Sequence, residues 1–281
     1  MWISIEGNVA VGKTSILKEL KSIASDKFSF IEEPIHLYSN YKDFNPLSLS
    51  YTEPVLNSAI TQLHIIENSF DWYSKIFSKY GHGLCISERC PFSSLIFIQH
   101  YLNLGQMSHF AAKFLKDKVT ELSSMRPWLS PDLIIYLSAS PDVCFQRSQI
   151  RARDEEASVS KTMFHSVHEC HEKLFKPKHN VIVVDANNSF RNVAKAVYHY
   201  IVQWIDQNLD KKTMTHTCNW CGCFIDSKYY CADCKKSCQQ ECITCHKPYP
   251  SLKYFQLNKN RCNSCHKRHQ KQCLKRKHAK S

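Results

Sequence analysis

The chain lacks any apolar run long enough to cross a lipid bilayer, which needs about 20 such residues. Glycine is scarce too, with 6 residues in a chain of 281. The first residues form a strand-like apolar segment and do not resemble a secretory signal. These absences argue against a membrane or secreted protein. We therefore expect a soluble protein of the cytoplasm.

Acidic residues are nearly absent from the last quarter of the chain. Residues 211–281 hold 3 Asp and Glu against 16 Lys and Arg, whereas residues 1–210 hold 22 against 21. The net charges are therefore +13 and −1, which sum to the +12 of the whole chain. Eleven of the 15 cysteines also lie after residue 210. This division predicts a near-neutral domain over residues 1–210 and a small, basic, cysteine-rich domain over residues 211–281.

Residues 7–14 have the pattern G-x-x-x-x-G-K-[ST] of a phosphate-binding loop. The pattern follows a strand-like run at 2–5 and precedes a helical run at 15–20, which is the context such a loop requires. Loop N–H groups and the helix N-terminus surround phosphates, the lysine reaches the β- and γ-phosphates, and the hydroxyl binds Mg²⁺. The residues that we expect to contact ATP are Gly7, Asn8, Val9, Ala10, Val11, Gly12, Lys13, Thr14 and Ser15, with Thr14 also on Mg²⁺.

Strand-like and helical runs alternate over the first 210 residues. Buried strands are predicted at 2–5, 28–31, 84–87, 133–137 and 181–184, and helices at 55–78, 91–104, after the fourth strand to 149, 160–175 and 189–208. This order predicts an α/β fold, a P-loop NTPase-type five-stranded parallel sheet with helices on both faces. Ligands of such sheets bind beyond the carboxyl ends of the strands.

Charged residues follow three of the predicted strands, where a ligand would bind. Glu33 follows the second strand, Glu88 and Arg89 follow the third, and Arg151 and Arg153 lie beyond the helix after the fourth. Each is weak evidence alone, because such residues often cap helices or lie on a solvated face. Together they meet the needs of phosphoryl transfer. One carboxylate accepts the proton of an attacking hydroxyl, another helps to hold Mg²⁺, and the guanidinium groups neutralise the phosphoryl oxygens.

Five segments in the same order resemble the deoxynucleoside kinase family over roughly residues 1–205. They are the phosphate loop, Glu33-Pro34, Tyr51-Thr52-Glu53-Pro54, Glu88-Arg89-Cys90 and residues 151–156. The resemblance implies ATP-dependent phosphorylation of the 5′-hydroxyl of deoxynucleosides in nucleotide salvage. It also implies a homodimer, because members of the family commonly dimerise through helices.

The resemblance assigns catalytic roles to the charged residues. It implies that Glu33 is the general base on the 5′-hydroxyl, that Glu88 lies near Mg²⁺ and this hydroxyl, and that Arg89 contacts the phosphate. Arg151 and Arg153 correspond to arginines of the family's lid, which bind the phosphates.

Four further residues correspond to nucleoside contacts of the family. The resemblance implies that Tyr51 and Glu156 bond the sugar 3′-hydroxyl and that Tyr38 packs beside the base, where the family has Trp. Gln62 is expected to pair with the base edge, because its amide offers a donor and an acceptor. The alternative for Gln62 is a surface amide on an amphipathic helix.

Two departures from the family pattern bear on the site. Cys90 replaces a Ser, and we interpret it as a buried small residue, although its place beside an arginine near a helix start would favour an oxidisable thiolate. Ser94 stands where the deoxycytidine and purine branch carries an Asp. The missing carboxylate predicts a preference for thymidine and other pyrimidines.

Two other functions fit part of the pattern. A nucleoside monophosphate kinase such as thymidylate kinase shares the loop, the sheet and a lid. Glu33 argues against it, because an acceptor phosphate is already anionic and favours an arginine at that place. The second alternative is a zinc-dependent binder of nucleic acid or protein whose kinase-like domain is an ATP-regulated scaffold.

The cysteine-rich tail carries four C-x-x-C pairs, the spacing typical of zinc knuckles. Eight thiolates suffice for two structural Zn²⁺ ions, and a cytosolic thiol cluster favours metal over disulfides. The predicted ligands are Cys218, Cys221, Cys231, Cys234, Cys242, Cys245, Cys262 and Cys265. Residues 242–266 look like a zinc ribbon of phage and viral proteins, which favours sequential pairing and hints at a viral source. Interleaved pairing is the alternative.

The basic residues of the tail gather after the last cysteine pair, between positions 267 and 280. They are consistent with binding to a nucleic-acid backbone, with docking to a protein, or with a solvated chain end. The sequence does not distinguish these three functions of the basic segment. If the source is viral, the expected compartment is the cytoplasm of the host cell.

Overall fold

The computed structural model describes residues 1–25, 27–80, 83–153 and 159–212, and four short strands closer to the C-terminus. The chain divides into two units, Met1–Asp206 and Gln207–Ser281. Among the described residues, none of the helices combines the length and apolarity needed to span a bilayer.

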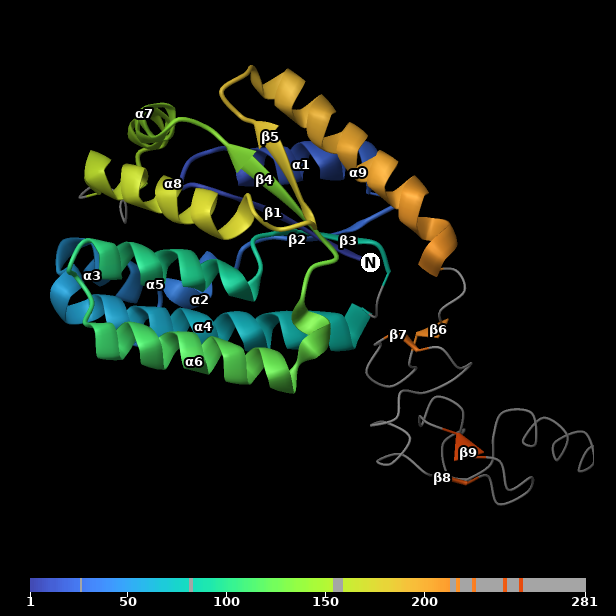
Figure 1. The fold of residues 1–281 in the computed structure, drawn as a ribbon, viewed down its shortest axis with the longest axis horizontal. Helices are drawn as coiled ribbons and strands as arrows, with labels where there is room; N and C mark the ends of the chain where they lie inside the picture. The colour runs from blue at the N-terminus through green and yellow to red at the C-terminus, as the bar shows by residue number, and fades with distance from the viewer. Residues whose placement is uncertain are drawn as a thin grey trace, which may run out of the picture. The chain divides into compact units, whose positions relative to one another are not determined.

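A five-stranded parallel sheet forms the centre of the first unit (Figure 1). The strand order is β2-β3-β1-β4-β5, so the strand that precedes the phosphate loop is central. The strands are β1 (Trp2–Gly7), β2 (Ser29–Ile31), β3 (Cys85–Glu88), β4 (Leu133–Ser138) and β5 (Val181–Asp185). Each overlaps an expected strand, and the parallel sheet is confirmed.

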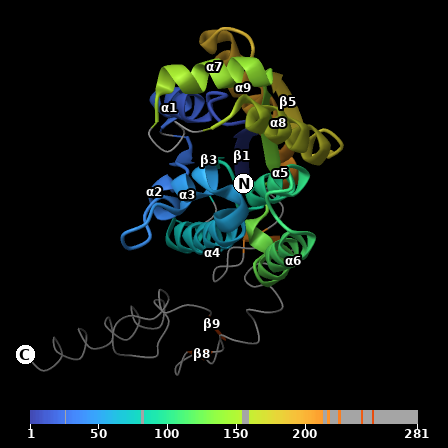
Figure 2. The same ribbon diagram turned by 90° about the vertical axis from the view of Figure 1, so that its left-hand side faces the viewer.

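Helices cover both faces of the sheet. Figures 1 and 2 show α1 and α9 over one face and α4, α5 and α6 over the other. The helices are α1 (Lys13–Ala24), α2 (Ile35–Tyr38), α3 (Pro46–Thr52), α4 (Pro54–Tyr80), α5 (Ser94–Asn103), α6 (His109–Met125), α7 (Pro141–Arg151), α8 (Lys161–Phe175) and α9 (Phe190–Lys212). Two 3-10 turns, η1 (Pro91–Ser93) and η2 (Pro127–Leu129), precede α5 and β4.

Alternation along β1 divides the core between the two faces. Ile3 and Ile5 are fully buried in one cluster, which includes Leu17 of α1. Trp2 points to the opposite face, where its ring lies 5.2 Å from the ring of Tyr73 and 4.9 Å from that of Phe77. Full burial of such side chains stabilises the fold by about 1.5–3 kcal/mol each. The central strand is thus held from both sides.

Three helices were absent from the expected order. Two of them, α2 and α3, are too short to show a clear helical period, although Asn45 caps α3 by accepting a hydrogen bond from the Ser48 N–H at 3.0 Å. The third, α6, buries Leu115, Val119 and Leu122 at helical spacing. Exposed phenylalanines elsewhere on α6 blur this apolar stripe in the sequence.

The second unit contains two pairs of antiparallel strands among its described residues. Strand β6 (His216–Thr217) pairs with β7 (Phe224–Ile225), and β8 (Gln240–Glu241) pairs with β9 (Pro248–Tyr249). The eight cysteines predicted as zinc ligands lie outside the described residues.

Candidate active site

The loop between β1 and α1 has a backbone that only certain residues allow. Gly7 has a φ of 147°, and a Cβ atom there would lie 2.6 Å from the carbonyl oxygen of Leu137. Gly12, which precedes the first turn of α1, has a φ of 113°. Both glycines are therefore needed for the loop to curve at the end of the central strand.

Lys13 follows this loop as the first residue of α1 and is only 5% exposed. Its Nζ donates hydrogen bonds to the carbonyl oxygens of Gly7 at 3.2 Å and Asn8 at 2.9 Å. Burial, with the nearby charge of Arg89, lowers the pKa of Lys13 to about 8. The ammonium group is thus held next to the place where a phosphate would bind.

Asn8 connects the loop to a helix distant in the sequence. Its Nδ2 donates a hydrogen bond to the carbonyl oxygen of Phe164 in α8 at 2.9 Å, and its Oδ1 accepts one from the Val9 N–H at 2.8 Å. The side chain is 2% exposed and anchors the loop. Asn8 therefore contacts ATP through its main chain if it contacts ATP at all.

Thr14 and Glu88 bring two oxygen ligands together at the start of α1. The Thr14 hydroxyl donates a hydrogen bond to Oε1 of Glu88 at 2.8 Å. Burial, with the charge of Glu33, raises the pKa of Glu88. Among the described residues, no cluster of three or more His, Cys, Asp or Glu side chains forms a metal site. A hydroxyl beside one carboxylate fits Mg²⁺, which usually takes few protein ligands and completes its shell with phosphates and water.

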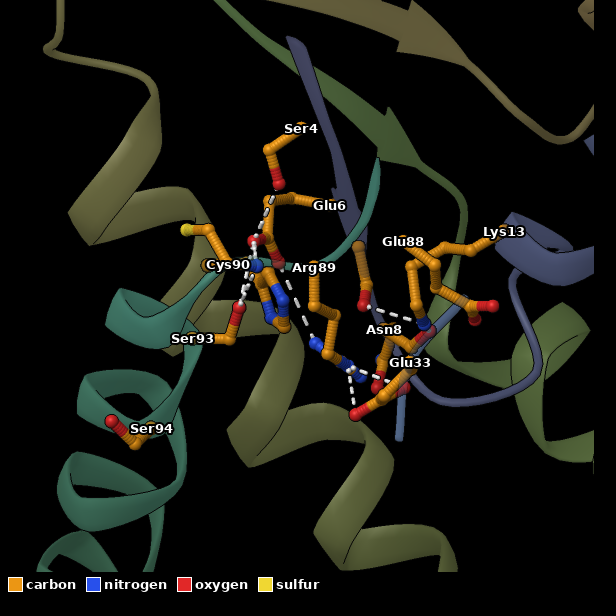
Figure 3. Close-up of polar contacts among 12 residues, drawn as sticks. Ser4, Glu6, Asn8, Lys13, Glu33, Glu88, Arg89, Cys90, Ser93 and Ser94 are labelled. Atoms are coloured by element: carbon orange, nitrogen blue, oxygen red, sulfur yellow. Dashed lines mark hydrogen bonds and ion pairs between the residues drawn. The ribbon is translucent and has the colours of Figure 1, made fainter. Parts of the chain in front are cut away.

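Arg89 lies at the centre of the charged groups in Figure 3. Its side chain is 8% exposed, and its Nε lies 3.2 Å from both carboxylate oxygens of Glu33. Carboxylates around it, foremost that of Glu33, raise the pKa of Arg89 although burial alone would lower it. The guanidinium thus lies against the side chain expected to act as the base.

The backbone of Arg89 is in the left-handed region, with a φ of 63°. This conformation costs a non-glycine residue about 1–2 kcal/mol. Hydrogen bonds offset the cost: the Arg89 N–H donates to the carbonyl of Ile5 at 3.0 Å, and the Arg89 carbonyl accepts from the hydroxyls of Tyr73 and Ser87, both at 2.7 Å. The strained turn sets the direction in which the guanidinium leaves β3.

One cavity gathers most of the predicted site residues, although they come from distant parts of the sequence. Those that line it are Lys13, Glu33, Tyr38, Tyr51, Gln62, Glu88, Arg89, Arg151 and Arg153. Gln62 is 2% exposed, and its Oε1 has no hydrogen-bond partner among the described residues, so this amide oxygen is available to a ligand. Glu156 lies outside the described residues.

A second cavity, of about 500 Å³, lies along the phosphate loop. It is lined by residues 10–16 and by Arg147, Asn188 and Phe190, among others. The two cavities share Lys13, Glu88, Arg151 and Arg153. A donor in one cavity and an acceptor in the other would therefore meet at these four charged side chains.

Arg147 is a residue of the site that the sequence prediction missed. Its guanidinium donates hydrogen bonds to the carbonyl oxygens of Val11 and Ala186, both at 3.1 Å. It therefore ties the phosphate loop to the turn after β5. Its spacing of four residues from Arg151 places both on one face of α7, a signal that the sequence contains.

The two departures from the expected pattern are both buried. Cys90 is 3% exposed, and burial, with the carboxylate of Glu6, raises its pKa well above the ordinary value, which disfavours a reactive thiolate. Ser94 is 3% exposed, lines the first cavity and donates a hydrogen bond to the Pro91 carbonyl at 2.8 Å.

A phosphate loop after the central strand of a parallel sheet, with carboxylates and arginines around adjoining cavities, defines a phosphoryl-transfer enzyme. A model of the deoxynucleoside kinase family matches residues 3–209, and the chain belongs to this family. The protein is therefore a kinase that phosphorylates deoxynucleosides with ATP.

Comparisons with individual proteins agree with this family. The chain is 28% identical over 222 residues to the mitochondrial thymidine kinase 2 of Macaca fascicularis, covering 74% of this chain and 76% of the relative. It is 27% identical over 195 residues to the thymidine kinase of Ictalurid herpesvirus 1, covering 69% and 82%. The deoxyadenosine kinase of M. mycoides with bound dCTP has the same fold, with a TM-score of 0.61 at 19% identity, covering 72% of this chain and all of that structure.

Proposed function

We propose that the protein transfers the γ-phosphoryl group of ATP to the 5′-hydroxyl of a deoxynucleoside with Glu33 as the general base. The observation that carries this proposal is the position of Glu33. Its carboxylate lines the first cavity and pairs with Arg89, beside the junction with the second cavity. A carboxylate at that place suits an acceptor that must lose a proton.

The remaining charged residues stabilise the phosphoryl group as it transfers. Lys13 contacts the β- and γ-phosphates, while Arg89, Arg151 and Arg153 neutralise the charge that develops on the phosphoryl oxygens. Thr14 and Glu88 hold Mg²⁺, which neutralises phosphate charge when it is bound. Arg147 and Phe190 form the outer part of the donor cavity.

The nucleoside occupies the first cavity, with Gln62 on the base edge, Tyr38 beside the base, and Tyr51 with Glu156 on the 3′-hydroxyl. The buried Oε1 of Gln62, which has no hydrogen-bond partner among the described residues, supports this placement. Thymidine and other pyrimidines are the preferred substrates, because Ser94 lines this cavity with a neutral hydroxyl where the deoxycytidine and purine branch of the family carries a carboxylate.

A phosphate-transfer assay tests the proposal and its main alternative together. The purified full chain is incubated with radiolabelled ATP, Mg²⁺ and each of the four deoxynucleosides or dTMP. We expect labelled 5′-monophosphates, formed fastest from thymidine, and no labelled dTDP. Conversion of dTMP without conversion of any deoxynucleoside would assign the protein to the monophosphate kinases.

The tail binds two structural Zn²⁺ ions through its four C-x-x-C pairs. Cys218 and Cys221 lie between the paired strands β6 and β7 in the sequence, and Cys242 and Cys245 lie between β8 and β9. A cysteine pair in the connection of a short hairpin is the arrangement of a zinc knuckle. So small a segment gains most of its folding free energy from metal.

The basic end of the tail contacts nucleic acid or protein. A titration of the full chain with single-stranded DNA at several salt concentrations separates these cases, because backbone binding weakens steeply with salt. Absence of DNA binding at low salt argues for a protein partner or a solvated end. In the alternative function, the kinase-like domain is only an ATP-regulated scaffold. That alternative predicts that the phosphate-transfer assay yields no labelled product.

The kinase is a homodimer of the cytoplasm, or of the host cytoplasm if the source is viral. Apolar side chains exposed near the N-terminal ends of α4 and α6 supply a surface for a second copy; they are Val55, Leu56, Ile60, Phe110 and Phe114. Sedimentation of the wild type and of Ile60→Glu tests the dimer.

A further inference from the structure

The central strand carries a buried polar row on one face. Trp2, Ser4 and Glu6 alternate along β1, so they point to the same side of the sheet. The Trp2 Nε1–H donates a hydrogen bond to the Ser87 hydroxyl at 2.7 Å, and Ser4 donates to Glu6 Oε1 at 3.1 Å. Each member of the row is thus bonded to β3 or to its neighbour in the row.

Glu6 is fully buried, at 0% exposure, yet it carries a carboxylate. Its Oε1 accepts hydrogen bonds from the Cys90 N–H at 2.9 Å and from the Ser93 hydroxyl at 2.7 Å, besides that from Ser4 (Figure 3). Burial of a carboxylate is costly unless donors or a cation compensate it. The strand therefore holds the turn that follows Arg89 through this single oxygen.

The other oxygen of Glu6 faces Arg89. Glu6 Oε2 lies 3.6 Å from Arg89 Nη1, and neither atom has a hydrogen-bond partner among the described residues. The same guanidinium pairs through its Nε with Glu33 on its other side. Arg89 thus lies between two carboxylates, one that lines the cavity and one that is closed off from solvent.

We propose that Glu6 is a positioning residue that holds the Arg89 guanidinium and the turn after it, which leaves Glu33 available to the 5′-hydroxyl. The proposal rests on the roles assigned above to Arg89 and Glu33. A base that pairs with a buried arginine must loosen that pair to accept a proton. Glu6 supplies the counter-charge that keeps Arg89 in place while Glu33 turns to the hydroxyl.

Backbone contacts support this assignment. The carbonyl of Ile5, next to Glu6, accepts the Arg89 N–H at 3.0 Å. β1 therefore fixes the left-handed backbone of Arg89 through Ile5 and the guanidinium through Glu6. Because the same strand ends in the phosphate loop, Arg89 is positioned relative to the bound phosphate by a single rigid element.

Glu6→Gln tests the proposal, because the amide keeps the size and the acceptor oxygen but removes the charge. We expect kcat for thymidine to fall about 10–100-fold, while KM for ATP and for thymidine stays within about threefold, since positioning acts on the transition state. Ser4→Ala removes a hydrogen bond from the same Oε1 but leaves the charge, so its kcat should stay within about twofold of the wild type. An unchanged kcat in Glu6→Gln, or a change in KM alone, overturns the proposal.

A second measurement keeps the test valid if Glu6→Gln does not fold. Arg89→Gln leaves the Glu6 carboxylate buried without its cation, which is destabilising. If the two residues act as a charge pair, the double variant Glu6→Gln/Arg89→Gln unfolds at a higher temperature than Arg89→Gln. A double variant that is equally or less stable contradicts the pairing. Absence of kinase activity in the wild type would instead contradict the proposed function, so the two failures are distinguishable.

Discussion

At the scale of single residues, the charge of Lys13 is the most sensitive feature of the phosphate loop. The ammonium group is buried, and the loop offers it only carbonyl oxygens at 2.9 and 3.2 Å. Burial lowers its pKa from 10.5 to about 8, and Arg89 adds to this effect. A bound phosphate has the opposite effect, because an anion favours the charged form.

This titration predicts a pH dependence of ATP binding. Below pH 8 Lys13 is charged before ATP binds, whereas above pH 8 binding requires uptake of a proton. We therefore expect the ATP affinity to be level from pH 7 to 7.5 and to fall by up to about tenfold per pH unit above pH 8. Calorimetry in two buffers of different ionisation enthalpy measures both the affinity and the proton uptake.

The matched control is Lys18→Met, which removes another lysine that lines the same cavity. It should keep the decline above pH 8, because Lys13 is unchanged. A wild-type affinity that stays constant from pH 7 to 9.5 would contradict the assignment to Lys13.

The position of a residue within a local motif could be predicted from the sequence, whereas that of a residue outside any motif could not. Glu33 and Arg89 follow strands in recognisable segments, and the structure places them in one cavity. Glu6 lies next to the end of β1, and its significance depends on contacts with Cys90 and Ser93, more than 80 positions away. A contact between distant segments leaves no periodic signal in a single sequence.

At the scale of elements, the donor cavity depends on a link between three segments. Arg147 of α7 bonds the carbonyl of Val11 in the phosphate loop and that of Ala186 after β5. Hydrogen bonds from charged groups contribute about 1.5–3 kcal/mol each. Arg147 therefore keeps the loop and the β5–α9 turn at a fixed separation.

Arg147→Ala should weaken ATP binding about tenfold, or about 1.4 kcal/mol, through loss of this link. Titration calorimetry at pH 7 measures the change. Arg126→Ala is the matched control, because Arg126 pairs with Asp71 at 3.1 Å and lies outside both cavities. Equal losses of affinity in the two variants would show that the link itself is unimportant.

Strands and helices were predicted correctly where the apolar residues follow a single clear spacing. The five strands are short, mostly apolar runs, typical of a sheet covered on both faces, and all five are present. The helix α6 was missed although Leu115, Val119 and Leu122 have helical spacing, because Phe110 and Phe114 are exposed on it. The sequence does not show which apolar residues are buried, so exposed ones obscure the spacing of the buried face of a helix.

At the scale of the whole molecule, the chain joins a kinase domain to a segment of very different composition. The tail holds 11 of the 15 cysteines and a net charge of +13 by sequence. A deoxynucleoside kinase active site needs neither feature. The zinc binding proposed for the tail therefore needs a test separate from that of the kinase activity.

Metal content distinguishes the two pairings of the tail. The wild-type chain should hold two Zn²⁺ by mass spectrometry. Replacement of Cys218, Cys221, Cys231 and Cys234 by Ser should leave one ion if pairing is sequential and none if it is interleaved. Cys223→Ser/Cys238→Ser, which changes cysteines outside the pairs, should keep both ions. A wild type without zinc would refute the zinc assignment.

The central claim is that Glu33 takes the proton of the 5′-hydroxyl, and Glu33→Gln tests it most directly. The amide fills the same space beside Arg89 but cannot act as a base. The account predicts that kcat for thymidine falls about 10²–10⁴-fold while the Kd for ATP changes by less than about twofold. A variant that binds ATP normally and keeps kcat within about threefold of the wild type would contradict the account.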